Sequence, residues 1–266
     1  MIVLRGHSPS IFQQDGVWYL VYEKHDASLP PLRKGRLRRR EQEKNSSSRF
    51  EICSSSDLIL FSEPKILLDS KDVPFAYEGL EKPRISRPQL FKDKDGYRLY
   101  FGASHVLLED TKQKATRYFA LAMSPTLEGP YALANEGEPL LSPLADDPYR
   151  NMACGSIKVV QASDGYVGFE CAMCWDKKQA RTTSILLQLE TKDGTTWNPS
   201  FRSELLTTPK RGWASRYVVS CDIHYKREEQ CWYCYYSANS KQSFFPVRES
   251  IGLLLGKDPM LRKVFI

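Results

Sequence analysis

Short runs of aromatic and aliphatic residues alternate with polar turns along the chain, a pattern typical of β-strands. The runs at residues 18–23 and 97–101 each follow an Asp-Gly pair, Asp15-Gly16 and Asp95-Gly96. An Asp-Gly pair between two strand-like runs predicts a hairpin, because the turn needs positive φ angles that these residues tolerate. The pattern therefore predicts an all-β fold, and no apolar run approaches the roughly 18 residues that a membrane-spanning helix needs.

The strand pattern recurs four times, at intervals of about 65–80 residues. Each repeat opens with a strand that carries an equivalent aliphatic residue: Ile11, Leu90, Ile157 and Ile223. An aromatic second strand follows at residues 18–23, 97–101, 166–170 and 232–237. A third follows at residues 50–54, 118–122, 184–188 and 251–255, and a short fourth is expected, for example at residues 65–68. Four antiparallel strands repeated in series predict the blades of a β-propeller, and we expect one propeller domain over residues 1–266.

Residues 27–48 interrupt the first repeat without a strand pattern, so we expect a disordered basic loop there. Seven basic and two acidic residues at positions 33–44 give this segment most of the chain's net charge of +6. No aromatic residue is interleaved with them, which favours a solvated loop over a segment that binds nucleic acid or acidic lipid. We therefore expect neither nucleic acid nor a membrane as a partner.

The cysteine content predicts free thiols. Seven cysteines cannot all pair within the chain, and the N-terminal residues become polar too soon for a secretory signal, so we expect a cytoplasmic location. Cys171/Cys174 and Cys231/Cys234 have the spacing of zinc ligands. Both pairs fall on predicted strands, where residues three apart point to opposite faces. The pattern favours buried thiols over a zinc site, and we expect no metal and no cofactor.

The propeller plan predicts a shared mouth of a central channel, where each first strand starts and each second strand ends. Three carboxylates expected there are candidate catalytic residues: Glu23, Glu170 and Asp222. The candidate substrate-binding residues are His7, Ser8, His25, Arg87, His105, Asn151 and His224. A polar funnel walled by aromatic rings suits a sugar. Structural alternatives stay open: Glu23 and His25 as solvated residues at a strand end, Arg87 as a bond to nearby carbonyl groups, and Asp222 with His224 as a structural pair.

Several of these segments resemble a known superfamily. Residues 86–91 read Ser-Arg-Pro-Gln-Leu-Phe and lead to the Asp-Gly hairpin at 95–101, with related phrases at residues 8–12 and 191–197. They resemble the five-bladed β-propeller superfamily of arabinanases, β-xylosidases, invertases and levansucrases. The Arg87-Pro88 opening is most similar to uncharacterised glycosidase-like members. The resemblance implies a fifth blade, degenerate or missing here, and a glycoside hydrolase-like protein that acts on or binds a carbohydrate or glycoconjugate.

The sequence departs from that superfamily at the positions of its catalytic carboxylates. The catalytic members carry Asp before the Pro of the first two blades, where this chain has Ser8 and Arg87. They carry a Glu at the start of the third blade, where residues 151–156 contain no carboxylate. Glycoside hydrolysis uses two carboxyl groups. A glycosidase, a glycoside phosphorylase and a non-catalytic sugar-binding or scaffold propeller therefore remain open, as do the sugar, the linkage and the oligomeric state.

Overall fold

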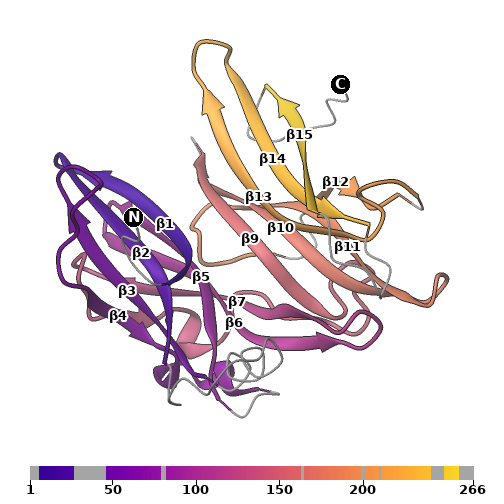
Figure 1. The fold of residues 1–266 in the computed structure, drawn as a ribbon, viewed down its shortest axis with the longest axis horizontal. Coiled ribbons are helices and arrows are strands. Elements are labelled where there is room, and N and C mark those ends of the chain that lie inside the picture. The colour runs from indigo at the N-terminus through magenta and orange to yellow at the C-terminus, as the bar shows by residue number, and fades with distance from the viewer. Residues whose placement is uncertain are drawn as a thin grey trace, which may run out of the picture. The chain divides into compact units, whose positions relative to one another are not determined.

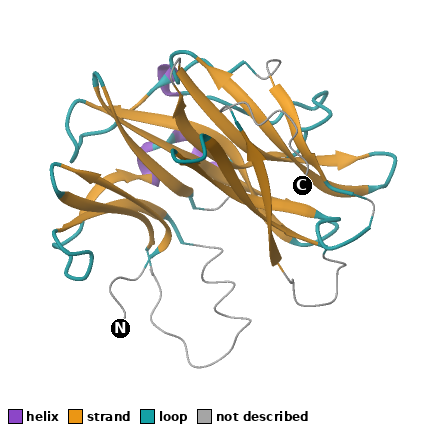
Figure 2. Cartoon of the chain, turned by 90° about the horizontal axis from the view of Figure 1, so that it is seen from above, coloured by secondary structure: helices purple, strands orange, loops and turns teal. Residues whose placement is uncertain are grey.

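A computed structural model describes residues 6–26, 46–78, 82–162, 165–198, 202–209, 211–240 and 249–257. Strands make up most of these residues (Figure 2). The helical elements among them are three short 3-10 helices: η1 (Ser70–Asp72), η2 (Pro74–Tyr77) and η3 (Asn135–Gly137). No described helix combines the length and the apolar character needed to cross a membrane. The predicted all-β class is confirmed.

Consecutive strands form four antiparallel sheets (Figure 1). Each sheet has the strand order of a propeller blade, and we call them blades 1 to 4. Blade 1 contains β1 (His7–Gln14), β2 (Val17–His25), β3 (Ser48–Ser55) and β4 (Lys65–Asp69). Blade 2 contains β5 (Ile85–Asp93), β6 (Gly96–Leu108), β7 (Gln113–Ser124) and β8 (Ala132–Leu133). Blade 3 contains β9 (Ala153–Ala162), β10 (Gly165–Asp176), β11 (Arg181–Thr191) and β12 (Arg202–Thr207). Blade 4 contains β13 (Tyr217–Lys226), β14 (Cys231–Asn239) and β15 (Glu249–Gly256).

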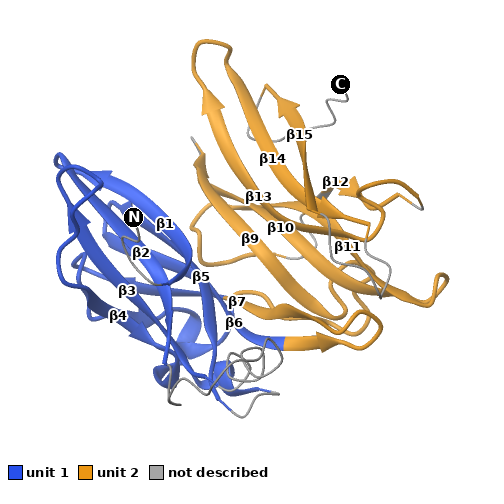
Figure 3. Cartoon of the chain, viewed as in Figure 1, with its two compact units in different colours: residues 1–105, 120–139 blue, residues 106–119, 140–266 orange. Residues whose placement is uncertain are grey.

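The chain forms two compact units (Figure 3). Unit 1 comprises residues 1–105 and 120–139, and unit 2 comprises residues 106–119 and 140–266. In unit 1, the core contains Val21, Phe50, Ile85 and Phe101, and the rings of Phe50 and Phe101 meet edge to face at 5.6 Å. In unit 2, a core shared by blades 3 and 4 contains the buried side chains of Phe169, Cys171, Leu186, Val218 and Cys234.

A β-bulge near the start of the first strand recurs in blades 1 to 3. The paired residues jump from His7↔Glu23 to Ser10↔Val21 in blade 1, so two residues of β1 face one residue of β2. The same jump follows the pairs Ser86↔Gly102 in blade 2 and Ala153↔Met173 in blade 3. The bulges need left-handed backbone angles, with φ of +49° at Ser8, +57° at Arg87 and +69° at Gly155. They give the blades a common register for comparing positions.

The hairpins and third strands fall where the sequence predicts them. Asp15 and Gly16 form the β1–β2 turn with φ values of +51° and +79°. The expected fifth blade has no counterpart among the described residues. The predicted loop at 27–48 ends too late, because Ser46 and Ser47 are buried and β3 begins at Ser48. The rest of that loop, with its basic run, lies outside the described residues.

Candidate functional site

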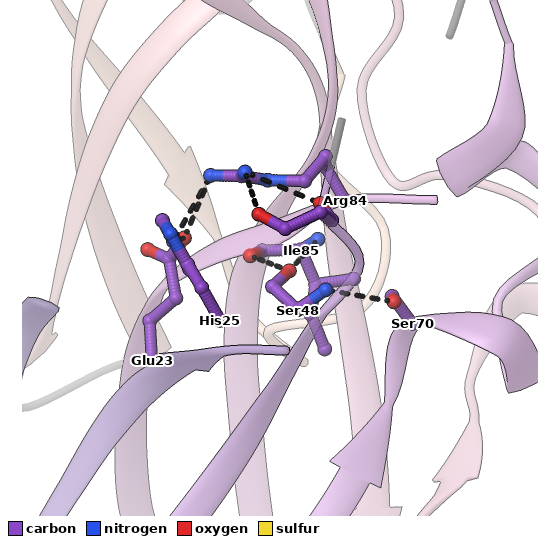
Figure 4. Close-up of polar contacts among 7 residues, drawn as sticks. Glu23, His25, Ser48, Ser70, Arg84 and Ile85 are labelled. Atoms are coloured by element: carbon purple, nitrogen blue, oxygen red, sulfur yellow. Dashed lines mark hydrogen bonds and ion pairs between the residues drawn. The ribbon is translucent and has the colours of Figure 1, made fainter. Parts of the chain in front are cut away.

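A buried carboxylate, two histidines and an arginine meet in unit 1, at the end of β2 and immediately before β5. Oε1 of Glu23 lies 2.5 Å from Nε2 of His25 and 3.2 Å from Nη2 of Arg84 (Figure 4). The ring of His7 stacks on that of His25 with centroids 4.4 Å apart. The Glu23 side chain is only 5% exposed, while His7 is exposed. We call these four residues the Glu23 cluster.

A serine sets the position of Arg84 in this cluster. Ser48 Oγ donates to the carbonyl oxygen of Ile85 at 2.7 Å and accepts the Ile85 backbone N–H at 2.8 Å. The backbone N–H of Ser48 in turn donates to Ser70 Oγ at 3.3 Å, and both serines are fully buried. These bonds tie the start of β3 to the start of β5, so the guanidinium of the preceding Arg84 reaches Glu23 (Figure 4).

The geometry gives His25 two exclusive hydrogen-bonding states. Nε2 lies 2.5 Å from Glu23 Oε1 and 3.0 Å from Arg84 Nη2. A protonated Nε2 donates to the carboxylate, whereas an unprotonated Nε2 accepts from the guanidinium. Arg84 also donates to Ser46 through Nη1, with contacts of 3.3 Å to its carbonyl oxygen and 3.4 Å to its hydroxyl. In the Glu23 cluster, the buried carboxylate is therefore bonded by His25 and Arg84, and the exposed ring of His7 covers that of His25.

Glu170 is held in a different way, inside unit 2. Its two carboxylate oxygens accept from Nε and Nη2 of Arg150 at 2.5 and 2.6 Å, and both side chains are fully buried. Burial raises the pKa of Glu170, and the Arg150 guanidinium opposes that rise. A catalytic group must touch its substrate. Full burial in a bidentate ion pair therefore favours a structural role for Glu170.

Asp222 and His224 lie within β13, because this strand begins at Tyr217 rather than near residue 221. The predicted placement of Asp222 at a strand start is therefore wrong. Its side chain is 75% exposed and forms an ion pair with Lys158 at 2.7 Å. His224 is also exposed. Both residues are on a strand face open to solvent in this unit, and the structure brings neither to Glu170.

The other predicted ligand-binding residues have mixed environments. Ser8 and Arg87 are half-buried at the bulges of β1 and β5, and His105 is half-buried near the end of β6. Asn151 uses its side chain within the protein. Its Oδ1 accepts the backbone N–H of Trp175 at 2.7 Å, and its Nδ2 donates to the Trp175 carbonyl at 3.4 Å.

Sequence reasoning missed Arg84 and selected Arg87. Arg84 lies in the connection between η2 and β5, where the repeat pattern supplies no equivalent position. A usable signal was present: three residues before the Arg87-Pro88 bulge, a second arginine precedes the predicted strand. Strand periodicity cannot tell which of two neighbouring arginines reaches the preceding blade, because that depends on the hydrogen bonds between Ser48 and the backbone of Ile85.

All seven cysteines are free thiols, as expected. Cys171, Cys174 and Cys234 are buried, and Cys231 is half-buried. Burial raises the pKa of Cys174 to about 11, and Asp176 and Asp147 add to the rise. The described residues contain no group of three or more His, Cys, Asp or Glu side chains arranged to hold a metal ion.

The fold is similar to that of solved glycoside hydrolases. An α-L-arabinofuranosidase from Lactobacillus brevis shares 16% identity, with a TM-score of 0.63 over 98% of this chain and 71% of that one. An endo-1,4-β-xylanase from Bacteroides thetaiotaomicron shares 14% identity, with a TM-score of 0.58 over 97% and 71%. A family 117 glycoside hydrolase from Zobellia galactanivorans shares 12% identity, with a TM-score of 0.64 over 96% and 67%.

The chain matches no protein-family model and no curated protein. The structural similarity nevertheless extends over almost the whole chain. The fold is therefore a propeller fold similar to those of solved glycoside hydrolases, without support for the five blades that the sequence resemblance implied.

Proposed function

We propose that this protein is a glycoside hydrolase-like protein that binds a carbohydrate through the Glu23 cluster. The buried Glu23 carboxylate beside His25, with the exposed His7 stacked above, is the observation that carries the proposal. Imidazole N–H groups and a carboxylate can bond the hydroxyl groups of a sugar. The fold supports the same class, because the similar structures include an arabinofuranosidase and a xylanase.

Among the three candidate carboxylates, we assign the functional role to Glu23. Glu170 is saturated by Arg150, and Asp222 is exposed in the middle of a strand. One carboxylate suffices for binding, whereas hydrolysis uses two. Binding without turnover is therefore the form of the proposal that the geometry supports best. We also propose that the Arg-Pro glycosidase-like proteins are relatives of this chain, and we propose a cytoplasmic location, in keeping with the free thiols.

Turnover is the second candidate activity, and the contact between Glu23 and His25 favours it. Nε2 of His25 lies 2.5 Å from the carboxylate, so a proton can pass between the two groups. In this case Glu23 donates a proton to the glycosidic oxygen as its bond to the anomeric carbon breaks, water or phosphate forms the new bond to that carbon, and the proton released by the attacking group restores Glu23.

The experiment compares Glu23→Gln with Glu51→Gln. Glu51 is also a buried carboxylate of blade 1, but it accepts bonds from Tyr22 and Arg49, away from the cluster. Calorimetry with arabino- and xylo-oligosaccharides and assays with nitrophenyl glycosides follow binding and turnover. We expect Glu23→Gln to weaken binding about tenfold or more, and Glu51→Gln to bind as wild type. Equal binding by wild type and Glu23→Gln would contradict the assignment, and turnover lost only in Glu23→Gln would establish the second activity.

A further inference from the structure

Trp175 presents an aromatic surface near the end of β10 in unit 2. This strand ends at Asp176, and the Trp175 side chain is exposed, at 37% of its full surface. The turn that follows is polar: the Asp176 carboxylate accepts backbone N–H groups of Lys178 and Gln179 at 2.9 and 3.1 Å. A single aromatic ring with polar neighbours differs from the contiguous apolar patch that a protein partner usually covers.

Asn151 fixes the backbone under this ring. Strand β9 begins at Ala153, and the last backbone bond before it runs from Met152 N–H to Met173 O at 3.1 Å. Beyond that bond, the side-chain amide of Asn151 pairs with the backbone of Trp175 in place of a strand residue. It accepts the N–H of Trp175 at 2.7 Å and donates to the Trp175 carbonyl at 3.4 Å. A side chain amide thus replaces the missing strand residue and holds Trp175 in place.

The cross-strand neighbour of Trp175 is tied down as well. Trp175 pairs with Thr182 of β11, whose backbone N–H donates to Oδ2 of Asp110 at 2.7 Å and whose hydroxyl also bonds that carboxylate. Arg216 forms an ion pair with the same carboxylate. The backbone of Trp175 and the backbone of its partner Thr182 are therefore both held by side-chain bonds. A backbone that is already fixed loses less entropy when a ligand binds.

The bulge register relates this position to the Glu23 cluster. His25 lies two residues after Glu23, the partner of His7 before the bulge, and Trp175 lies two residues after Met173, the partner of Ala153. Trp175 is therefore the blade 3 equivalent of His25. The repeat places an imidazole at this position in one blade and an indole in the other.

We propose that Trp175 is a stacking platform for one ring of a carbohydrate and that Asn151 is its positioning residue. The inference rests on the proposed carbohydrate function. Pyranose and furanose rings have one face of C–H groups that packs on an aromatic ring, while their hydroxyl groups remain available to polar neighbours. Asn151, predicted as a direct sugar ligand, acts instead through the backbone of Trp175.

The test measures binding of xylotriose and arabinotriose by calorimetry and by tryptophan fluorescence. We expect Trp175→Ala to weaken binding about tenfold or more and Trp175→Phe to retain most of it. Asn151→Ala, which removes both bonds to the Trp175 backbone, weakens binding, whereas Asn151→Asp weakens it less because the carboxylate still accepts the Trp175 N–H but cannot donate to the Trp175 carbonyl. The fluorescence change on binding disappears in Trp175→Phe. Trp213→Phe is the matched control, since Trp213 is 44% exposed and stacks on Tyr236.

The outcomes separate the two proposals. Wild-type affinity in Trp175→Ala, with the fluorescence change intact in Trp175→Phe, overturns the platform and leaves the carbohydrate function standing. A wild-type chain that binds neither trisaccharide nor any glycoside of the panel overturns both. Loss of binding in Trp175→Ala with retention in Trp175→Phe shows that the chain folds and that the ring is required. A loss shared by Trp213→Phe overturns the specific role of Trp175.

Discussion

Arg150 and Glu170 form a bidentate ion pair in which neither side chain is exposed to solvent. Arg150 precedes β9 and Glu170 lies within β10, so the pair ties the loop before blade 3 to the middle of its second strand. Asp147 in the same loop accepts a bond from Arg202 at 2.5 Å, which adds the outer strand β12 to the network. The carboxylate that the sequence pattern offers as an acid therefore links strand β10 to the loop before β9.

Removal of one partner of this pair is expected to destabilise the protein strongly. Glu170→Gln leaves the Arg150 cation buried with less compensation, and Arg150→Met leaves the carboxylate alone. Each change should lower the free energy of unfolding by about 3–5 kcal/mol, measured by urea denaturation. Asp222→Asn is the control, because it removes a largely exposed ion pair with Lys158 and should cost at most about 1 kcal/mol. Similar small losses in all three variants would refute the structural role.

The repeat made the blades predictable, because strand alternation and Asp-Gly turns are local signals. Local signals also located the turn at residues 191–197, which the structure confirms around Asp193. Residue-by-residue equivalence was harder, since each bulge adds one residue to a strand without a fixed sequence mark. Blades 1 to 3 each contain such a bulge, and its residue with positive φ is of a different type in each blade: Ser8, Arg87 and Gly155.

The candidate site was predicted in part. Glu23, His25 and His7 come from one hairpin of blade 1, so their proximity follows from strand pairing, and the structure brings them together. Arg84 lies beside them because Ser48 bonds the backbone of Ile85, the residue that follows Arg84. Ser48 and Ile85 are 37 positions apart, and no local sequence pattern predicts their contact. Trp175 was missed because Glu170 was taken as the strand end, whereas β10 continues to Asp176.

The Asp193 turn predicts a pH dependence of stability. Burial raises the pKa of Asp193, but bonds from the Thr196 and Thr195 backbone N–H groups, at 2.7 and 2.8 Å, outweigh it and hold the pKa well below its usual range. A folded-state pKa below the unfolded value stabilises the protein above the unfolded pKa, and this stabilisation is lost as the pH falls. Asp193→Asn should therefore be less stable than wild type at pH 7, by about 1 kcal/mol.

That difference should shrink as the pH falls from about 5 toward 2, because Asp193 of the unfolded chain takes up a proton in this range while the carboxylate of the folded protein stays ionised. Urea denaturation of both proteins across this range measures it. A stability difference that stays constant with pH would show that the carboxylate charge contributes nothing at this turn.

A side chain added at Gly168 is expected to clash with Trp197, which belongs to the same turn. A Cβ added at Gly168 would lie 2.7 Å from the ring of Trp197, whose indole N–H donates to the Gly194 carbonyl at 3.0 Å and whose ring meets Phe119 edge to face. Because Trp197 is anchored on both sides, Gly168→Ala should lower the free energy of unfolding by about 1–3 kcal/mol. Gly168→Ala combined with Trp197→Leu should cost less than the sum of the two single changes. Strict additivity in urea denaturation would show that the two sites do not clash.

The thiols should react in the order of their burial. Desolvation and the neighbouring Glu51 raise the pKa of Cys53 to about 11, and Cys174 is shifted to a similar value. The thiolate is the reactive form, so both residues should be protected from dithionitrobenzoate in the native protein at pH 8, while the half-buried Cys231 reacts first. Mass spectrometry of peptides after brief labelling identifies the modified sites, and Cys231→Ser should remove the fastest phase. Early labelling of Cys53 or Cys174 in the folded chain would mean that β3 or β10 opens faster than its burial suggests, because a thiol with so high a pKa reacts only once water reaches it.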